Sequence, residues 1–289
     1  MRVAPPSHLE VEIGTFCNRR CPWCPNGWSE RGQRHDRMPE RIWRALLRDL
    51  RATRFEGTFA FHNYNEPLAD PSLLGRVRQA RRAMPHARLS IFTNGDLLDR
   101  PMLDRLVRAG VDEMRVTLYP PARRAFEPPD ATVIARLLRR LRIGRKGLQV
   151  DKERRIERRL RVGRALLVIK VPRIESYCDR AGSVALAQLA SRRRRRAGCL
   201  YPYLSAAIDF RGNLKLCCHV YETSRPEDRP YVVGNVGETP FSELWASARL
   251  DRLRARLARA DFRGLPACAR CTHRMRPWMI REAKRRRQG

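Results

Sequence analysis

Three cysteines near the start of the chain, Cys17, Cys21 and Cys24, form a C-x3-C-x2-C run. Three thiolates at this spacing on one loop can hold three corners of a [4Fe–4S] cube and leave one iron open. The run follows an apolar, alternating segment at residues 9–13, which is typical of a strand. The next cysteine is Cys178, so no fourth ligand lies nearby. An iron left open in this way can bind a small molecule.

The cysteine run resembles the cluster motif of radical S-adenosylmethionine (radical SAM) enzymes. This resemblance implies that the open iron binds the amino and carboxylate groups of SAM, and that one electron cleaves SAM to a 5′-deoxyadenosyl radical. It also implies that Trp23, just before the third cysteine, lies beside the adenine. The alternative is a zinc site or a disulfide. Zinc motifs usually contain two C-x2-C or H-x3-H halves, and this spacing differs from them.

Two further segments resemble SAM-binding motifs of the same family. Phe61–Leu68 resembles its Gly-Gly-Glu-Pro segment, although Tyr64 and Asn65 replace the glycines. Asparagine is a tolerable substitute because it also visits positive φ. Thr93–Asp96 contains the Thr-Asn-Gly that is common at the end of the third strand in this family. The resemblance implies that the side chains at SAM are Trp23, Asn63, Asn65, Glu66, Thr93, Asn94 and Thr117.

A second cysteine array comes late in the chain and consists of Cys199, Cys217, Cys268 and Cys271. Four thiolates can close a second [4Fe–4S] cluster with no open iron. Residues 204–219 are expected to form a hairpin around Arg211-Gly212-Asn213. The array resembles the auxiliary-cluster ("twitch") domain of some radical SAM enzymes. A four-cysteine zinc site is the alternative, but the hairpin and the first motif together favour iron–sulfur.

Strand and helix patterns alternate through the first two thirds of the chain, which indicates parallel strands in βα units. We expect an α/β fold, with a partial (β/α)5–6 barrel of TIM type in residues 1–190. A small α+β auxiliary-cluster domain is expected in residues 191–289. The basic stretch up to about Arg164 is expected to be irregular, and Ser242 to cap a helix that runs through Leu257. In such barrels the chemistry lies at the C-terminal ends of the strands.

Nearly the whole chain is similar to twitch radical SAM enzymes of aminocyclitol and aminoglycoside antibiotic biosynthesis. This similarity implies a small-molecule substrate of that class, with hydrogen abstraction from a secondary-alcohol carbon. It also implies that Arg180 lies at the carbinol, and that an external flavodoxin- or ferredoxin-like protein donates electrons. Such a substrate is cationic, so local carboxylates are needed. The candidates are Asp96, Asp179 and Glu222.

Two cysteines lie outside both arrays. Cys178 is expected at the barrel mouth, where its thiol could return a hydrogen atom to the opposite face of the substrate radical and invert the centre. We therefore predict an epimerase. The alternative is a dehydrogenase, in which a base takes the hydroxyl proton and the auxiliary cluster accepts an electron, so that a ketone results. Cys218 adjoins a ligand on an expected strand, so we expect its side chain to point away from Cys217 as buried filler.

The net charge of +31 invites a second reading as a basic RNA-binding or RNA-modifying protein. Only five of the 61 basic residues are lysine, and this bias also suits a high-GC genome. No apolar run reaches about 18 residues, so no membrane span is expected. The N-terminus lacks the long apolar core of a signal peptide. Nine cysteines in such a chain indicate reduced, metal-holding thiols in the cytoplasm.

Overall fold

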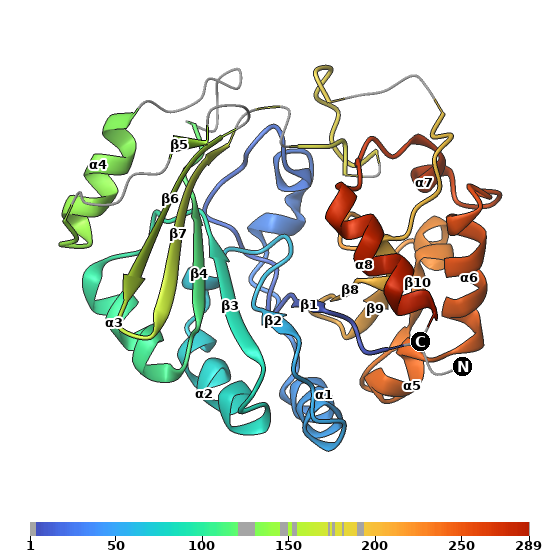
Figure 1. The fold of residues 1–289 in the computed structure, drawn as a ribbon, viewed down its shortest axis with the longest axis horizontal. Helices are drawn as coiled ribbons and strands as arrows, with labels where there is room; N and C mark the ends of the chain where they lie inside the picture. The colour runs from blue at the N-terminus through green and yellow to red at the C-terminus, as the bar shows by residue number, and fades with distance from the viewer. Residues whose placement is uncertain are drawn as a thin grey trace.

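The computed structural model describes residues 4–120, 131–144, 150–151, 155–172, 174, 177–180, 182–189 and 194–288. Ten strands in this part of the chain form one continuous sheet (Figure 1). Their bounds are His8–Val11 (β1), Thr58–Ala60 (β2), Arg88–Thr93 (β3), Glu113–Thr117 (β4), Val150–Asp151 (β5), Arg155–Val162 (β6), Ala165–Pro172 (β7), Ser205–Ile208 (β8), Asn213–Lys215 (β9) and Val232–Asn235 (β10).

Six strands in the middle of the sheet run parallel, in the order β8, β1, β2, β3, β4 and β7. Antiparallel strands extend the sheet on both sides, with β9 and β10 beyond β8, and β6 and β5 beyond β7. The parallel strands bring their C-terminal ends to one edge, where barrels of this kind place their chemistry. The expected partial barrel of TIM type is therefore confirmed.

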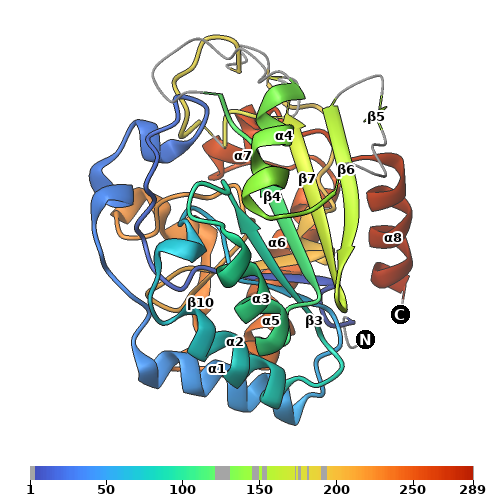
Figure 2. The ribbon, with the colours of Figure 1, turned by 90° about the vertical axis from the view of Figure 1, so that its left-hand side faces the viewer.

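Helices cover the outer face of the parallel strands, and each buries one apolar side (Figure 2). The first of them buries Trp43, Leu46 and Leu50 against the strands. The third begins at Asp99, whose side chain accepts from Met102 N, and ends at Gly110 with a φ of 110°. The helices are Glu40–Ala52 (α1), Leu73–Ala83 (α2), Arg100–Ala109 (α3), Ala131–Arg140 (α4), Phe241–Trp245 (α5), Ala248–Ala258 (α6), Pro266–Arg270 (α7) and Pro277–Gln288 (α8).

The last part of the basic stretch before Ala165, Arg155–Val162, is a strand, so the expectation of an irregular segment is wrong there. Residues 145–149 and 152–154 lie outside the described residues. Strand β6 pairs with β7 along its whole length, from Arg155 opposite Pro172 to Val162 opposite Ala165. In the second half of β6, Leu160 and Val162 turn inward while Arg159 and Arg161 are exposed. The high charge hid this alternation in the sequence. It also suits a strand near the edge of a sheet, where charged side chains discourage further pairing.

The helix expected from Ser242 to Leu257 is two helices, and Ser242 does not cap it. Its hydroxyl donates to Asp49 Oδ1 at 2.7 Å and so ties α5 to α1. Ser247 lies between α5 and α6, and its side chain accepts from Leu250 N at the start of α6. The break therefore comes from a capping serine five residues later than expected.

The C-terminal part is attached to the barrel through the sheet, because β8 pairs in parallel with β1. The division expected between residues 190 and 191 lies outside the described residues and stays a prediction. Within the described residues, no helix combines the length and apolar character that a membrane crossing requires.

Candidate active site

A cavity of about 340 Å³ lies where the C-terminal ends of the parallel strands meet the first cysteine loop and the segment after β9. The three cysteines of the first array line it, and so does Arg180. The seven side chains expected at SAM line it as well: Trp23, Asn63, Asn65, Glu66, Thr93, Asn94 and Thr117. Segments far apart in the sequence thus converge on one space.

The first cysteine array is held as a cluster-binding loop. Burial, with a smaller contribution from the nearby Cys24 thiolate, raises the pKa of both Cys17 and Cys21 to about 12. Crowded, buried thiols of this kind become thiolates only when a cation stabilises them, and iron is such a cation. Arg19 clamps the loop, since its guanidinium pairs with Asp96 at 2.6 Å. Asp96, a candidate for the substrate amine, is therefore already engaged in this ion pair.

Glu66 sits in a cradle of hydrogen bonds at the end of β3. Its Oε1 accepts from Thr93 Oγ1 at 2.7 Å and from Leu68 N at 3.0 Å. Its Oε2 accepts from Asn94 N at 2.8 Å. Burial raises the pKa of Glu66 to about 7, although these hydrogen bonds lower it in part. A buried carboxylate of this kind suits a cationic ligand, and Thr93 and Asn94 act by orienting it.

The two asparagines expected at SAM are placed differently. The amide nitrogen of Asn63 donates to Glu10 at 2.7 Å and to the Cys218 carbonyl at 3.2 Å, while its oxygen accepts from Lys215. Both ends of the Asn63 amide are thus engaged within the protein. Asn65 Nδ2 is buried and has no hydrogen-bond partner among the described residues. Of the two, Asn65 is the one with a donor free for a ligand.

Aromatic side chains form the wall beside the first cysteine array. Trp23 is 2% exposed and packs with Cys21. Its ring centroid lies 6.0 Å from that of Tyr119 and 6.4 Å from that of Tyr177. Flat apolar surfaces of this kind can stack on an adenine.

The thiols of the second array lie close enough to affect one another electrostatically. Cys199 N donates to Leu257 O at 2.8 Å, and Cys268 lies on the short helix α7. Burial raises the pKa of Cys268 to about 12, and the Cys199 and Cys271 thiolates raise it further. Cys217 is close enough to Cys199 for the same electrostatic effect. All nine cysteines lie in the described part of the chain and are free thiols, which suits metal binding.

The two cysteines outside the arrays lie beside the cavity. Cys218 is buried as expected, but its thiol lies within 4.8 Å of that of Cys217, so the expectation that it points to the opposite face is wrong. It lines the cavity, and its thiol lies 3.4 Å from Tyr201 OH. Strand β9 ends at Lys215, so the alternation of a strand does not extend to residue 218. Cys178 is buried but is not among the described residues that line the cavity. Its thiol lies 3.5 Å from His219 Nδ1.

Arg180 lies in a loop that is tied to the second array. The neighbouring Asp179 accepts from Thr272 Oγ1 at 3.2 Å, next to Cys271, so this expected carboxylate is also engaged. Arg180 adopts a φ of 49°, and its guanidinium lies 3.1 Å from His219 Nδ1. This loop therefore holds Arg180 at the cavity from the side of the C-terminal part.

The sequence did not reveal the carboxylate that shares the cavity with Glu66. Glu10 on β1 is 6% exposed and lines the cavity. His8 Nε2 lies 3.6 Å and His62 Nε2 lies 3.9 Å from its carboxylate oxygens. Burial lowers the pKa of His62 to about 4, so this imidazole is neutral at pH 7. A charged residue on a central parallel strand was the available signal, because such strands are normally apolar on both faces.

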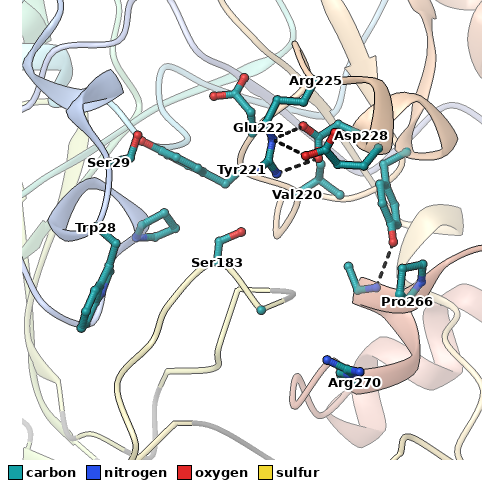
Figure 3. A pocket seen from close by; sticks show the side chains of 15 residues that line it. Trp28, Ser29, Ser183, Val220, Tyr221, Glu222, Arg225, Asp228, Pro266 and Arg270 are labelled. Carbon is teal, nitrogen blue, oxygen red and sulfur yellow. Dashed lines mark hydrogen bonds and ion pairs between the residues drawn. The ribbon is translucent and has the colours of Figure 1, made fainter.

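A second cavity of about 600 Å³ lies on the outer side of the same segments (Figure 3). Trp28 and Tyr221 line one part of it and Arg270 another. Glu222, the third expected carboxylate, lines this outer cavity and not the inner one. Arg225 pairs here with Asp228 at 2.9 Å.

Residues 11–150 match the family model of the radical SAM superfamily, and residues 199–272 match that of the SPASM iron–sulfur cluster-binding domain. The chain is 25% identical over 267 residues to S-adenosyl-L-methionine-dependent 2-deoxy-scyllo-inosamine dehydrogenase of Niallia circulans, covering 92% of this chain and 93% of that protein. It is also 32% identical over 115 residues to PqqA peptide cyclase of Gluconobacter oxydans, covering 39% of this chain and 30% of that protein.

Among solved structures, the fold is similar to that of BtrN in complex with AdoMet and 2-DOIA, with a TM-score of 0.68 and 23% identity over 93% of this chain and 94% of that one. The chain thus carries a radical SAM domain in residues 11–150 and a SPASM-type iron–sulfur cluster-binding domain in residues 199–272. Its cofactors are accordingly SAM and two [4Fe–4S] clusters.

Proposed function

We propose that this enzyme oxidises a secondary alcohol of an aminocyclitol or aminoglycoside to a ketone. The observation that carries the proposal is the composition of one cavity, which holds the first cysteine array, Glu66, Arg180 and the buried carboxylate of Glu10. The similarity to an aminocyclitol dehydrogenase over nearly the full length of both chains supports the same reaction.

In this proposal each cysteine array holds one of the two clusters. Cys17, Cys21 and Cys24 hold the cluster that binds SAM, with Glu66 at the amino group of SAM. When bound, these groups supply the radical that takes a hydrogen atom, and the auxiliary cluster supplies an acceptor for the remaining electron. The auxiliary cluster is held by Cys199, Cys217, Cys268 and Cys271.

The task of the remaining residues is to hold the carbinol and to remove its hydroxyl proton. The substrate loses one hydrogen atom from carbon, one proton from oxygen and one electron. His62 is placed to accept the proton, because its Nδ1 is buried in the cavity wall with no partner among the described residues. Glu10 lies at the other ring nitrogen and orients the imidazole.

Glu10 is also proposed to bind the substrate ammonium. A chain with a net charge of +31 repels a cation at long range, so recognition requires a nearby carboxylate. Glu66 is assigned to SAM, and the three carboxylates expected from the sequence do not line the inner cavity. Of the described residues, Glu10 is the remaining carboxylate that does.

Epimerisation is the second candidate, and the position of Cys218 favours it. Its thiol lines the cavity and could return a hydrogen atom to the substrate radical, with the inverted alcohol as product. Cys178, which the sequence favoured as donor, contacts His219 instead of lining the cavity. Because Cys178 does not line the cavity, we rank Cys218 above it as a donor. The similarity to a dehydrogenase is the reason that we rank oxidation above inversion.

Turnover of 2-deoxy-scyllo-inosamine in D2O, with Cys218→Ala and Cys178→Ala as separate variants, tests the choice. Oxidation predicts a ketone two hydrogens lighter than the substrate from all three proteins. A product that carries one carbon-bound deuterium in the wild type and loses it in one cysteine variant would establish inversion. SAM turnover that requires RNA would overturn both candidates. Iron content, measured on each variant, controls for cluster loading.

The electron source and the compartment follow from the cofactors. Reductive cleavage of SAM needs a low-potential donor, and a flavodoxin- or ferredoxin-like protein is proposed for this role. Clusters with an open iron are sensitive to oxygen, so we place the reaction in the cytoplasm.

A further inference from the structure

His219 is one of the polar residues that line the cavity, and no motif in the sequence marked it. It is 7% exposed and lines the same cavity as Arg180 and Cys218. Its backbone is fixed on both sides, because its N–H donates to Cys217 Sγ at 3.3 Å and its carbonyl accepts from Tyr64 OH at 3.1 Å. The imidazole is therefore held in one place by the protein.

The two ring nitrogens of His219 have different surroundings. Nδ1 lies 3.1 Å from the Arg180 guanidinium and 3.5 Å from the Cys178 thiol. Nε2 is buried and has no hydrogen-bond partner among the described residues. A buried polar atom without a partner is rare in a folded protein and costs stability unless a ligand satisfies it.

Arg180 determines which nitrogen carries the proton. A guanidinium is always charged and can only donate, so Nδ1 must accept and must lack a hydrogen. A doubly protonated ring would place two donors against each other at 3.1 Å. The imidazole is therefore neutral, and its hydrogen is on Nε2. His219 thus offers one N–H donor that the rest of the protein leaves free.

The charge nearby defines what this donor can bind. The Arg180 guanidinium opposes an ammonium at the same point, so the group bound there is an uncharged or partly negative oxygen. A second imidazole, that of His273, lies with its ring centroid 4.4 Å away and adds no negative charge. The carboxylate that suits an ammonium is Glu10, on strand β1 of the cavity wall.

We propose that His219 donates its Nε2–H to the oxygen on the carbon that is oxidised, first as the alcohol and then as the ketone. This inference rests on the proposed oxidation of a secondary alcohol. Arg180 acts in it by fixing the tautomer of the ring.

Two substitutions separate this role from simple packing. His219→Asn keeps a side-chain acceptor near the Nδ1 position for Arg180 but cannot reach the Nε2 position. His219→Gln reaches the Nε2 position with an amide N–H. His86→Asn serves as a matched control at an exposed histidine that does not line the cavity.

Product analysis of the wild type first identifies the carbon that is oxidised. The readout is then the affinity of each loaded, SAM-bound protein for two ligands. These are 2-deoxy-scyllo-inosamine and its analogue that lacks the hydroxyl at that carbon. We expect the wild type, His86→Asn and His219→Gln to prefer the alcohol over the deoxy analogue. His219→Asn should lose about 5- to 100-fold of that preference. It should also release 5′-deoxyadenosine in excess over ketone, because the carbinol is no longer held.

An unchanged preference in His219→Asn would overturn the role of His219 while leaving the oxidation intact. Failure of the wild type to bind or oxidise the aminocyclitol would instead overturn the proposed function, and this inference with it. If His219→Asn does not load its clusters, the comparison of His219→Gln with the wild type decides. A Gln variant that binds both ligands equally would then contradict the donor at the Nε2 position.

Discussion

Replacement of Glu10 by glutamine should weaken binding of an amine-bearing substrate far more than binding of its hydroxyl analogue. At about 4 Å and an effective dielectric constant of about 20, a carboxylate and an ammonium attract by about 4 kcal/mol. Desolvation reduces the net value to about 1.5–3 kcal/mol for a hydrogen bond between charged groups. Because Glu10 is only 6% exposed, solvent screens this pair weakly. The expected loss of affinity is about 10- to 150-fold.

The assay is the dissociation constant of 2-deoxy-scyllo-inosamine, and of the analogue with a hydroxyl in place of the amine, for the loaded protein with SAM. Glu10→Gln should lower affinity for the amine and leave that for the hydroxyl analogue within about threefold. Glu222→Gln, in the outer cavity, is the matched control and should change neither. Equal losses for both ligands, or equal behaviour of the two variants, would refute the ammonium assignment.

Three other predictions concern SAM binding and stability. Glu66→Gln should weaken SAM binding at least about tenfold in equilibrium dialysis, because the cradle then offers a neutral amide to the ammonium; unchanged affinity would contradict the assignment. Arg31→Met leaves the fully buried Glu12 without its arginine partner, although Tyr64 N still donates to it, and should lower the free energy of unfolding of the cluster-free chain by about 3–5 kcal/mol. The Arg31→Met/Glu12→Met double variant should recover most of this loss. His62 has a pKa of about 4 in the folded chain and about 6.5 in the unfolded chain. Between pH 4 and pH 6.5 this imidazole is therefore protonated in the unfolded chain and neutral in the folded chain. Stability should therefore fall as the pH is lowered from 6.5 to 4, by up to about 3 kcal/mol, and His62→Gln should flatten this part of the profile.

The sequence predicts the parallel strands well because apolar runs and the motifs that follow them mark each strand end. The same motifs bring the SAM side chains into one cavity, since the C-terminal ends of parallel strands share an edge. Strand β6 could not be predicted in this way, because its inward residues are interrupted by arginines. Its pairing with β7 depends on a tight turn at Gly163, where φ is 55°.

The polar wall of the cavity was harder to predict than its cysteine loop. Cys218 was assigned to the wrong face because strand alternation was extended past the end of β9. Glu10 and His62 meet only through the lateral pairing of β1 with β2, which the sequence does not specify. His219 carries no motif, and its free nitrogen is evident only from the positions of Arg180 and Cys178.

The most direct test of the central claim is the fate of the carbinol hydrogen. Ring-deuterated 2-deoxy-scyllo-inosamine, turned over anaerobically by the reduced, fully loaded enzyme, should give one 5′-deoxyadenosine with one deuterium for each ketone formed. A Cys17/Cys21/Cys24→Ala triple variant should give neither product. Recovery of 5′-deoxyadenosine without deuterium, or of a ketone in excess over 5′-deoxyadenosine, would contradict oxidation by hydrogen abstraction in this cavity.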